Sequence, residues 1–255
     1  RKADEIAEKM GIEKECPSRV KSGIKYGLNY YAGEGNTYVP KDELCERVAQ
    51  LLDLSRELVY DNLVEMAFEG QVQVDALKGQ TVVYLYAYYY AEQKVCQNIA
   101  AINGAELKGL SVDADSMIKK TESETGIVLS DQQAEAVKSS LSCGLSVITG
   151  GPGTGKTTII NTLINIFEQS GFKVAIAAPT GRAAKRITET SGHYASTIHR
   201  LLEYYYSEGE DAMRFGKNSE DTLKYDAVIV DEASMIDLML MQGLTDAIKP
   251  GTRLI

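Results

Sequence analysis

Residues 150–157 combine glycines with a lysine and a threonine in a spacing that suits phosphate binding. They read GGPGTGKT and fit the pattern G-x-x-x-x-G-K-[ST] at every fixed position. Glycines let the backbone turn so that successive N–H groups face one anion, and a following helix adds its positive N-terminal end. An apolar run at 145–149 precedes the segment, and a helical pattern at 156–170 follows it. The spacing therefore predicts a phosphate-binding loop between a strand and a helix.

The expected ligand of this loop is ATP with Mg²⁺. Lys156 supplies a positive charge for the β- and γ-phosphates, and the Thr157 hydroxyl is placed to hold the metal. The competing interpretation is a glycine-rich turn without a chemical role. The predicted nucleotide-binding residues of the segment are Gly150, Gly151, Pro152, Gly153, Thr154, Gly155, Lys156, Thr157 and Thr158.

Two acidic residues end a second apolar run, in residues 226–234, which read DAVIVDEAS. Asp231 is placed to hold Mg²⁺ as a Walker B aspartate does, and Glu232 is placed to accept a proton from an attacking water. A buried strand that stops at a solvated acidic pair is the competing interpretation. With Lys156, these acids are the predicted catalytic residues. The set lacks a positive group on the far side of the γ-phosphate.

Composition limits the classes of function. The 255 residues are 44% hydrophobic and carry a net charge of −9, so a core is available, and any contact with nucleic acid must be local because general duplex binders are usually basic. The four cysteines form no C-x-x-C pair and there are two histidines, so no zinc site is predicted. We expect four buried thiols and a cytoplasmic protein without a signal peptide or membrane segment.

The C-terminal part alternates strands and helices. Apolar strands at 145–149, 173–178, 227–230 and 253–255 are separated by helical patterns at 156–170, 181–190, 197–202 and 237–248. This order predicts an α/β fold, in which a parallel sheet is covered on both faces and binds its ligand at the carboxyl ends of the strands. We expect a P-loop NTPase lobe at 129–255 and a linker at 104–128.

Residues 1–103 have a different pattern. Helices at 17–31, 41–52 and 56–69 precede a hairpin at 71–76 and 81–86, which is the order of a winged-helix domain. The third helix carries acidic residues at a spacing of four, which places like charges on one exposed face. We therefore expect this domain to contact protein rather than read the major groove. These acids are Glu57, Asp61, Glu65 and Glu69.

Further segments narrow the class. The glycine-rich loop and four further segments occur in an order that resembles the motif order of superfamily 1 DNA helicases. The four segments are 129–137 (LSDQQAEAV), 178–186 (APTGRAAKR), 196–202 (STIHRLL) and 230–235 (VDEASM). The resemblance is closest to the RecD-like (1B) group, which includes the exodeoxyribonuclease V alpha chain. It covers 129–255 with specific motifs and extends more loosely to 38–40 and 89–92. It implies a RecA-like motor lobe.

The resemblance also implies roles for single residues. Gln133 would recognise adenine, although Ser130 and Gln133 also fit a capping box at a helix start. Motifs Ia and Ib would contact single-stranded DNA; their residues here are Pro179, Thr180, Gly181, Arg182, Thr197, His199 and Arg200. The local excess of basic residues (Arg182, Lys185, Arg186 and Arg200 against Glu189) suits phosphates. A solvated helix face and, for His199, a structural role are the alternatives.

The implied function is an ATP-dependent helicase that moves 5′→3′ along single-stranded DNA in recombination or repair. The chain begins without Met and ends before the second RecA-like lobe with its expected arginine finger, so we expect a fragment that is weakly active or inactive alone. The motor part of a conjugative relaxase-helicase is one alternative. Another is an ATP-sensing adaptor that is not a motor and binds a protein partner through the winged-helix part.

Overall fold

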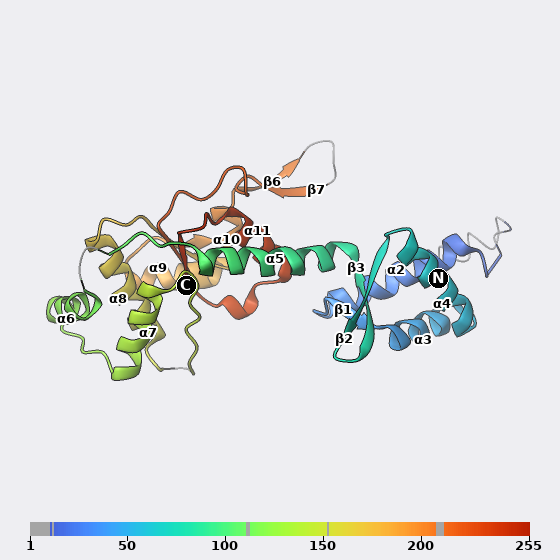
Figure 1. Cartoon of the computed structure of the whole chain (residues 1–255), viewed down its shortest axis with the longest axis horizontal. Coiled ribbons are helices and arrows are strands. Elements are labelled where there is room, and N and C mark those ends of the chain that lie inside the picture. The colour runs from blue at the N-terminus through green and yellow to red at the C-terminus, as the bar shows by residue number, and fades with distance from the viewer. Residues whose placement is uncertain (1–10, 12, 111–112, 152, 208–211) are drawn as a thin grey trace. The chain divides into compact units, whose positions relative to one another are not determined.

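The computed structural model describes residues 11, 13–110, 113–151, 153–207 and 212–255. Pro152, one of the predicted loop residues, therefore lies outside the described residues. The chain forms two compact units, Arg1–Gln93 and Lys94–Ile255, and helix α5 (Tyr86–Gly104) contains the boundary between them (Figure 1). This division differs from the predicted one at 103, because the second half of α5 packs with the second unit: Ile102 belongs to that unit's core.

The first unit contains the predicted helices and hairpin. Ser55 caps the third helix, as its hydroxyl accepts a hydrogen bond from Leu58 N at 3.2 Å. The three strands form an antiparallel sheet in the order β1-β3-β2. The elements are α2 (Pro17–Gly33), β1 (Tyr38–Pro40), α3 (Lys41–Leu52), α4 (Arg56–Phe68), β2 (Val72–Leu77) and β3 (Gln80–Leu85).

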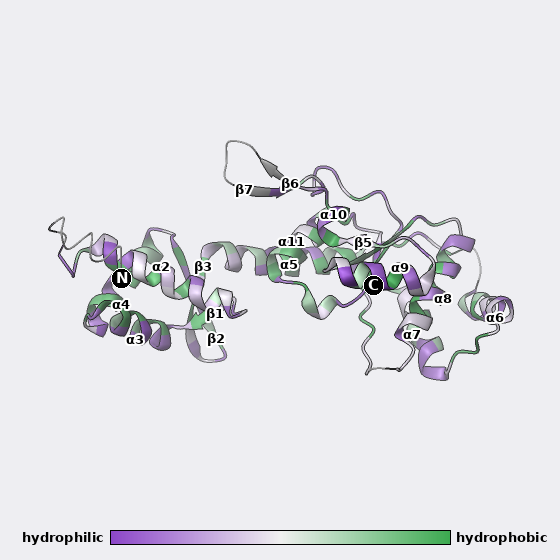
Figure 2. Cartoon of the chain, turned by 180° about the vertical axis from the view of Figure 1, so that it is seen from behind, coloured by the Kyte–Doolittle hydropathy of each residue, from purple (hydrophilic) through white to green (hydrophobic). Residues whose placement is uncertain are grey.

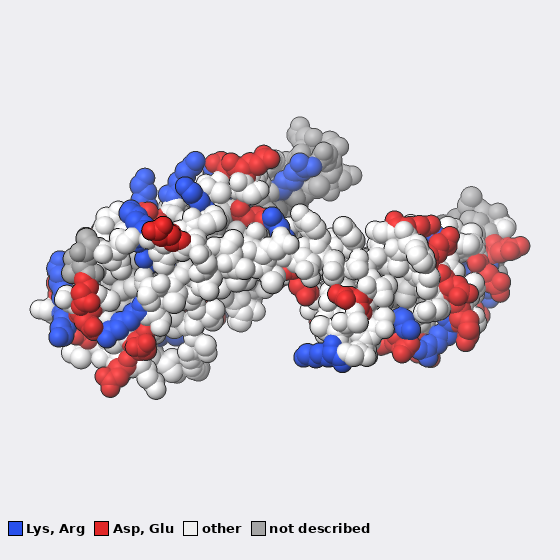
Figure 3. Space-filling view, viewed as in Figure 1, with Lys and Arg blue, Asp and Glu red and all other residues white. Residues whose placement is uncertain are grey.

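The acidic residues of α4 are exposed, as expected, but two of them form ion pairs inside the unit. Lys21 on α2 lies 3.1 Å from Glu65 and 2.8 Å from Glu69, so these carboxylates help to join α2 to α4. The hydrogen bond to Glu69 is the main reason why the pKa of Lys21 is raised. Figure 3 shows acidic and basic side chains interspersed on the visible face of this unit.

The second unit is built on a parallel sheet in the order β5-β4-β8-β9. Its helices carry both hydrophobic and hydrophilic surface (Figure 2), as helices that cover a sheet should. The strands are β4 (Val174–Ala178), β5 (Ser196–Thr197), β8 (Ala227–Val230) and β9 (Arg253–Leu254). The helices besides α5 are α6 (Ala114–Thr125), α7 (Asp131–Ser142), α8 (Lys156–Gln169), α9 (Gly181–Ser191), α10 (Ile198–Leu201) and α11 (Leu238–Ala247).

Alternate residues of β4 enter two different cores. Ile176 and Ala178 pack with residues of α6, α7, α8 and α9, whereas Ala175 and Ala177 pack with residues of α5, α10 and α11. Since successive side chains of a strand point to opposite faces, the sheet is covered on both sides. The predicted α/β fold with a parallel sheet is confirmed.

The predicted strand at 145–149 is only a single bridge in the structure. Leu145 pairs with Leu254, and Ser146 N donates to Leu254 O at 2.9 Å. Val147, at 80% exposure, follows without regular structure. The expectation of a five-residue strand before the loop was therefore wrong.

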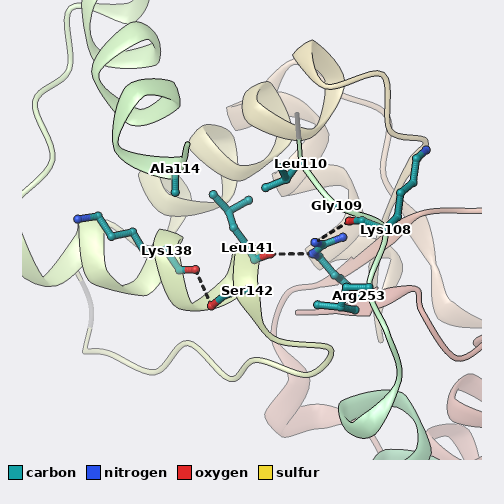
Figure 4. Close-up of a pocket in the computed structure, with 9 residues that line it drawn as sticks. Lys108, Gly109, Leu110, Ala114, Lys138, Leu141, Ser142 and Arg253 are labelled. Carbon is teal, nitrogen blue, oxygen red and sulfur yellow. Dashed lines mark hydrogen bonds between the residues drawn. The ribbon is translucent and has the colours of Figure 1, made fainter. Parts of the chain in front are cut away.

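The predicted linker contains a helix that belongs to the core. Met117 and Ile118 of α6 are buried with residues of α7 and α8. Arg253, which is 2% exposed, holds the segment before α6 in place: its Nη2 donates to Lys108 O at 3.1 Å and its Nε to Leu141 O at 3.0 Å (Figure 4). The segment thus packs with the second unit.

The polar segment at 203–223 contains two paired strands, β6 (Tyr204–Ser207) and β7 (Ala212–Phe215).

The expectation of four buried thiols was wrong. Cys96, on α5, and Cys143, just after α7, are both exposed, and of the four cysteines only Cys45 is buried. No helix in the described part of the chain combines the length and hydrophobicity that crossing a bilayer requires.

Candidate nucleotide and nucleic-acid sites

The glycine-rich loop leads directly into α8. Gly155 is the N-cap of this helix and has φ +82°, a left-handed conformation that costs glycine little. A Cβ atom on Gly155 would also collide with Gln133 Nε2, and one on Gly150 would lie 2.6 Å from Thr154 Oγ1. A side chain at either position would therefore require the Gln133 or the Thr154 side chain to move.

Lys156 is the first residue of α8, and its ammonium group faces the loop. Its Nζ donates hydrogen bonds to the carbonyl oxygens of Gly150 and Gly151, the second at 3.2 Å. Thr157 is exposed at the same helix end. A cation and a hydroxyl thus stand at the positive end of a helix dipole, which is a favourable place for an anion.

The acidic pair lies just beyond the end of β8. Asp231 N donates to Ala177 O at 3.0 Å, which extends the contact between β8 and β4. Asp231 Oδ1 accepts a hydrogen bond from Glu232 N at 3.0 Å. Glu232 has φ +56°, and such strain in a non-glycine residue is typical of functional sites.

One cavity joins the loop lysine and threonine to the acidic pair. Its volume is about 60 Å³, much less than the several hundred Å³ of a typical ligand pocket. A nucleotide would therefore extend from it over the exposed glycine-rich loop. Its lining residues come from α8, from α9 and from the end of β8: Lys156, Thr157, Ile160, Asn161, Arg186, Ile187, Thr190, Ser191, Asp231 and Glu232.

Gln133 forms the predicted capping box and also contacts the glycine-rich loop. Its Oε1 accepts from Ser130 N at 2.9 Å, and Ser130 Oγ accepts from Gln133 N at 3.4 Å, which completes the capping box of α7. Its Nε2 donates to Thr154 O at 3.0 Å. The start of α7 is therefore hydrogen-bonded to the loop, and the Gln133 amide lies beside it.

The predicted DNA-binding residues lie at or just after the carboxyl ends of two neighbouring strands, β4 and β5. Ala178 of β4 is in register with Thr197 of β5. Thr180 Oγ1 caps α9 by accepting from Ala183 N, and Thr197 Oγ1 caps α10 by accepting from Arg200 N, each at 3.2 Å. The structure thus brings motifs Ia and Ib to one edge of the sheet.

The basic and aromatic side chains of this edge differ in their surroundings. Arg182 and Arg200 are exposed and form no salt bridge with another described residue. His199 instead packs against Tyr204 and Phe215, with ring centroids 5.1 and 6.4 Å apart. This packing supports a structural role for His199.

The sequence reasoning placed Arg186 in the basic DNA patch, whereas the structure places it in the cavity with Lys156 and Asp231. The sequence did not indicate a role for Asn161, which lines the same cavity. Neither residue belongs to a motif whose spacing signals nucleotide binding. Their presence in the cavity depends on how α9 lies against α8, which the local sequence does not encode.

A parallel sheet, a glycine-rich loop at a helix N-terminus and an acidic pair at a neighbouring strand end define an α/β P-loop NTPase lobe. Residues 133–255 match the family model described as "AAA domain". Residues 1–38 match the "ATP-dependent RecD2 DNA helicase HHH domain". Fold, site and family matches agree on a nucleotide-binding lobe preceded by a separate N-terminal region.

Two curated relatives specify the family. The chain is 35% identical over 209 residues to the RecBCD enzyme subunit RecD of Mycolicibacterium smegmatis, covering 73% of this chain and 36% of that protein. It is 30% identical over 267 residues to the ATP-dependent RecD2 DNA helicase of Deinococcus radiodurans, covering 99% of this chain and 36% of that protein. The chain belongs to the RecD-like family and comprises its N-terminal region and first motor lobe. It spans about a third of the length of these relatives.

Proposed function

We propose that this chain is part of an ATP-dependent DNA helicase that couples ATP hydrolysis to 5′→3′ movement along single-stranded DNA in recombination or repair. The observation that carries the proposal is the cavity in which Lys156 and Thr157 face Asp231 and Glu232. The direction of movement follows from the resemblance to the RecD-like group, and the cytoplasm is the compartment that such a role requires.

The residues present fit ATP and Mg²⁺. The described residues contain no cluster of three or more His, Cys, Asp or Glu side chains that could hold a metal by themselves. Mg²⁺ in such sites commonly has only one or two protein ligands and shares phosphate oxygens and water. Thr157 and Asp231 would be those ligands. Bound Mg²⁺ would neutralise charge on the phosphates.

The proposed roles of the side chains follow from their positions. Lys156 binds the β- and γ-phosphates at the N-terminus of α8, and the backbone N–H groups of the loop bind the phosphate chain. Glu232 accepts a proton from the attacking water at its carboxylate. Gln133, which already lies beside the loop, binds the adenine edge. Positioning and charge complementarity, rather than covalent chemistry, would supply the rate enhancement.

The DNA strand would cross the edge of the sheet formed by motifs Ia and Ib. Thr180 and Thr197 lie there at the starts of helices, and Arg182 and Arg200 add exposed positive charge. Contacts of this kind bind the phosphate backbone and carry little sequence information. A helicase requires such binding because it must act on any sequence.

Movement along DNA would require a second lobe that closes on the nucleotide. The partners proposed for the chain are therefore single-stranded DNA, the second RecA-like lobe of the full-length protein and, through the first unit, another protein. The exposed acidic residues Glu57 and Asp61 on α4 support the last of these, because they repel DNA phosphates.

The direct test is ATP hydrolysis by the full-length protein with and without single-stranded DNA. We expect stimulation by DNA, and we expect Lys156→Ala to abolish the turnover because the phosphates lose their cation. Lys224→Ala is a matched control, since Lys224 is 80% exposed and does not line the cavity. Turnover that DNA does not stimulate, or that survives Lys156→Ala, would contradict the proposal.

A further inference from the structure

We propose that Arg186 is a second cation of the nucleotide site and binds the terminal phosphate of ATP. This inference rests on the proposed function and deepens it, because it supplies in the same chain a positive group opposite the loop lysine. Arg186 belongs to α9, a helix outside the glycine-rich loop and the acidic pair, yet it lines the same cavity as Lys156, Asp231 and Glu232.

The position of the cavity indicates which phosphate Arg186 would meet. None of the described glycine-rich loop residues before Lys156 lines it; the lining begins at Lys156 and Thr157 and continues to Asp231 and Glu232. The loop amides bind the inner phosphates, whereas the metal ligands and the catalytic base act at the outer end of the triphosphate. A cation in this cavity therefore contacts the γ-phosphate rather than the α-phosphate.

The helix that carries Arg186 is firmly placed. Four of its residues line the cavity at positions i, i+1, i+4 and i+5, which form one face of a helix: Arg186, Ile187, Thr190 and Ser191. Ile187 is only 4% exposed and is part of the core. Thr180 caps the start of α9, and Gly192 ends it with φ +75°. Arg186 thus extends from a fixed backbone.

The charges in the cavity have no salt-bridge partners within the described chain. This applies to the cations Lys156 and Arg186 and to the carboxylates Asp231 and Glu232. Two cations and two carboxylates that share a cavity without pairing complement a ligand that carries both signs of charge. A triphosphate with a divalent cation is such a ligand, and guanidinium binds phosphate with strong charge-assisted hydrogen bonds.

Asn161 provides a second, independent observation. Its Oδ1 atom is buried and accepts no hydrogen bond, and Asn161 lines the same cavity from α8. Buried polar atoms without partners are rare and indicate a missing interaction. Arg186 has five N–H donors, so it can donate to Asn161 and still bind a phosphate.

The neighbouring Lys185 distinguishes this role from a general effect of charge. Lys185 carries the same charge on the same helix and, like Arg186, is exposed. It differs in that it pairs with Glu189 at 3.7 Å and does not line the cavity. If α9 served only to attract DNA phosphates, the loss of Lys185 and the loss of Arg186 would have the same effect on nucleotide binding. If Arg186 binds the γ-phosphate, only its loss changes how the protein distinguishes ATP from ADP.

The experiment measures the affinity of the full-length protein for ADP and for a non-hydrolysable ATP analogue, without DNA. We expect Arg186→Ala to weaken binding of the analogue about tenfold and binding of ADP less than about twofold, since a charged hydrogen bond to the γ-phosphate is lost. Arg186→Lys should keep part of the analogue affinity. Lys185→Ala should bind both nucleotides as the wild type does, and thermal unfolding should confirm that all variants are folded.

Equal ratios of analogue to ADP affinity in Arg186→Ala and Lys185→Ala would overturn the inference. A second contrary result would be that Arg186→Ala loses single-stranded DNA binding and keeps the wild-type ratio of analogue affinity to ADP affinity. That result would also overturn the inference and would assign Arg186 to the DNA-binding surface at motifs Ia and Ib. In both cases the proposed function would stand, provided that Lys156→Ala abolishes turnover. If the wild-type protein binds neither nucleotide, the proposed function fails and the inference fails with it.

Discussion

Gln133 donates a hydrogen bond from Nε2 to the carbonyl oxygen of Thr154 at 3.0 Å. This bond joins the first turn of α7 to the glycine-rich loop, far along the chain. Because the same amide also accepts a hydrogen bond from Ser130 N, its orientation is fixed before any base binds. An amide that is held in this way can recognise a base edge with little loss of side-chain entropy.

Gln133→Ala should raise the KM for ATP by about tenfold and reduce the preference for ATP over GTP, because the oriented amide is lost. Ser130→Ala is the control: it removes the hydroxyl that caps α7, at a cost of about 1 kcal/mol in stability, but leaves the Gln133 amide. Steady-state hydrolysis of both nucleotides by the full-length protein checks this. An equal change of preference in the two variants would show that Gln133 acts only as a cap.

Glu232→Gln should lower kcat for ATP hydrolysis by roughly 10²- to 10⁴-fold, the usual contribution of a general base. Nucleotide affinity should change little, because the loop and Lys156, rather than Glu232, are the proposed ligands of the phosphates. Single-turnover hydrolysis and equilibrium binding of ATP together check this prediction. A similar loss in affinity and in kcat would indicate that Glu232 binds the ligand rather than the attacking water.

Glu232→Gly tests the backbone strain at the same position. Glycine adopts the φ of +56° found here without the cost that a non-glycine residue bears there. We expect this variant to be as stable as the wild type or more stable, although it is inactive. Thermal unfolding measures the difference, and a clear decrease in melting temperature would show that the Glu232 side chain stabilises the fold.

Arg253→Met should lower the free energy of unfolding by about 3 kcal/mol, because Lys108 O and Leu141 O lose a charged donor. The loss should be large although no charge partner is removed, since Arg253 is 2% exposed and also stacks near Phe172, 5.4 Å from its ring centroid. Arg200→Met, at an exposed position, is the control. Urea unfolding measures both variants, and equal stability would contradict the role of Arg253 in holding the segment before α6.

Asp226 should make stability depend on pH. Burial alone would raise the pKa of its carboxyl group, but hydrogen bonds from Lys173 N at 2.8 Å and Lys108 Nζ at 3.1 Å outweigh burial and hold the pKa below its ordinary value. A lowered pKa in the folded state means that this stabilisation is present above the unfolded pKa and is lost as the pH falls through the folded one.

We therefore expect Asp226→Asn to be less stable than the wild type at pH 7. The difference should begin to shrink as the pH falls below about 4, where the carboxyl group of the unfolded chain takes up a proton. Urea unfolding at pH 7 and at pH 3 gives both values. A difference that stays constant between these pH values would exclude a linkage through Asp226.

Much of the local structure was predictable because its signals lie close together in the sequence. Ser130 marked a helix start that the structure shows, and the apolar run at 227–230 is β8 to the residue. Apolar periodicity and caps act within one or two turns of chain. The glycine-rich loop was recognisable for the same reason, since its function depends on consecutive backbone N–H groups.

The wrong expectations concern positions whose pairing or burial depends on residues that are distant in the sequence. The run at 145–149 has strand composition, but within the described residues it pairs only at Leu145. Cys96, on α5, and Cys143, just after α7, are exposed because no other described element covers them. Strand pairing and burial both depend on neighbours that composition does not identify.

The sequence by itself determined the α/β fold, the phosphate-binding loop, the acidic pair and the capping box at Ser130, because each depends on residues a few positions apart. Only the tertiary structure decided that Gln133 reaches Thr154, that Arg253 holds the segment before α6 and that Arg186 shares a cavity with Lys156 and Asp231. These relationships arise from how helices pack against a sheet, and packing brings together residues that no local pattern connects.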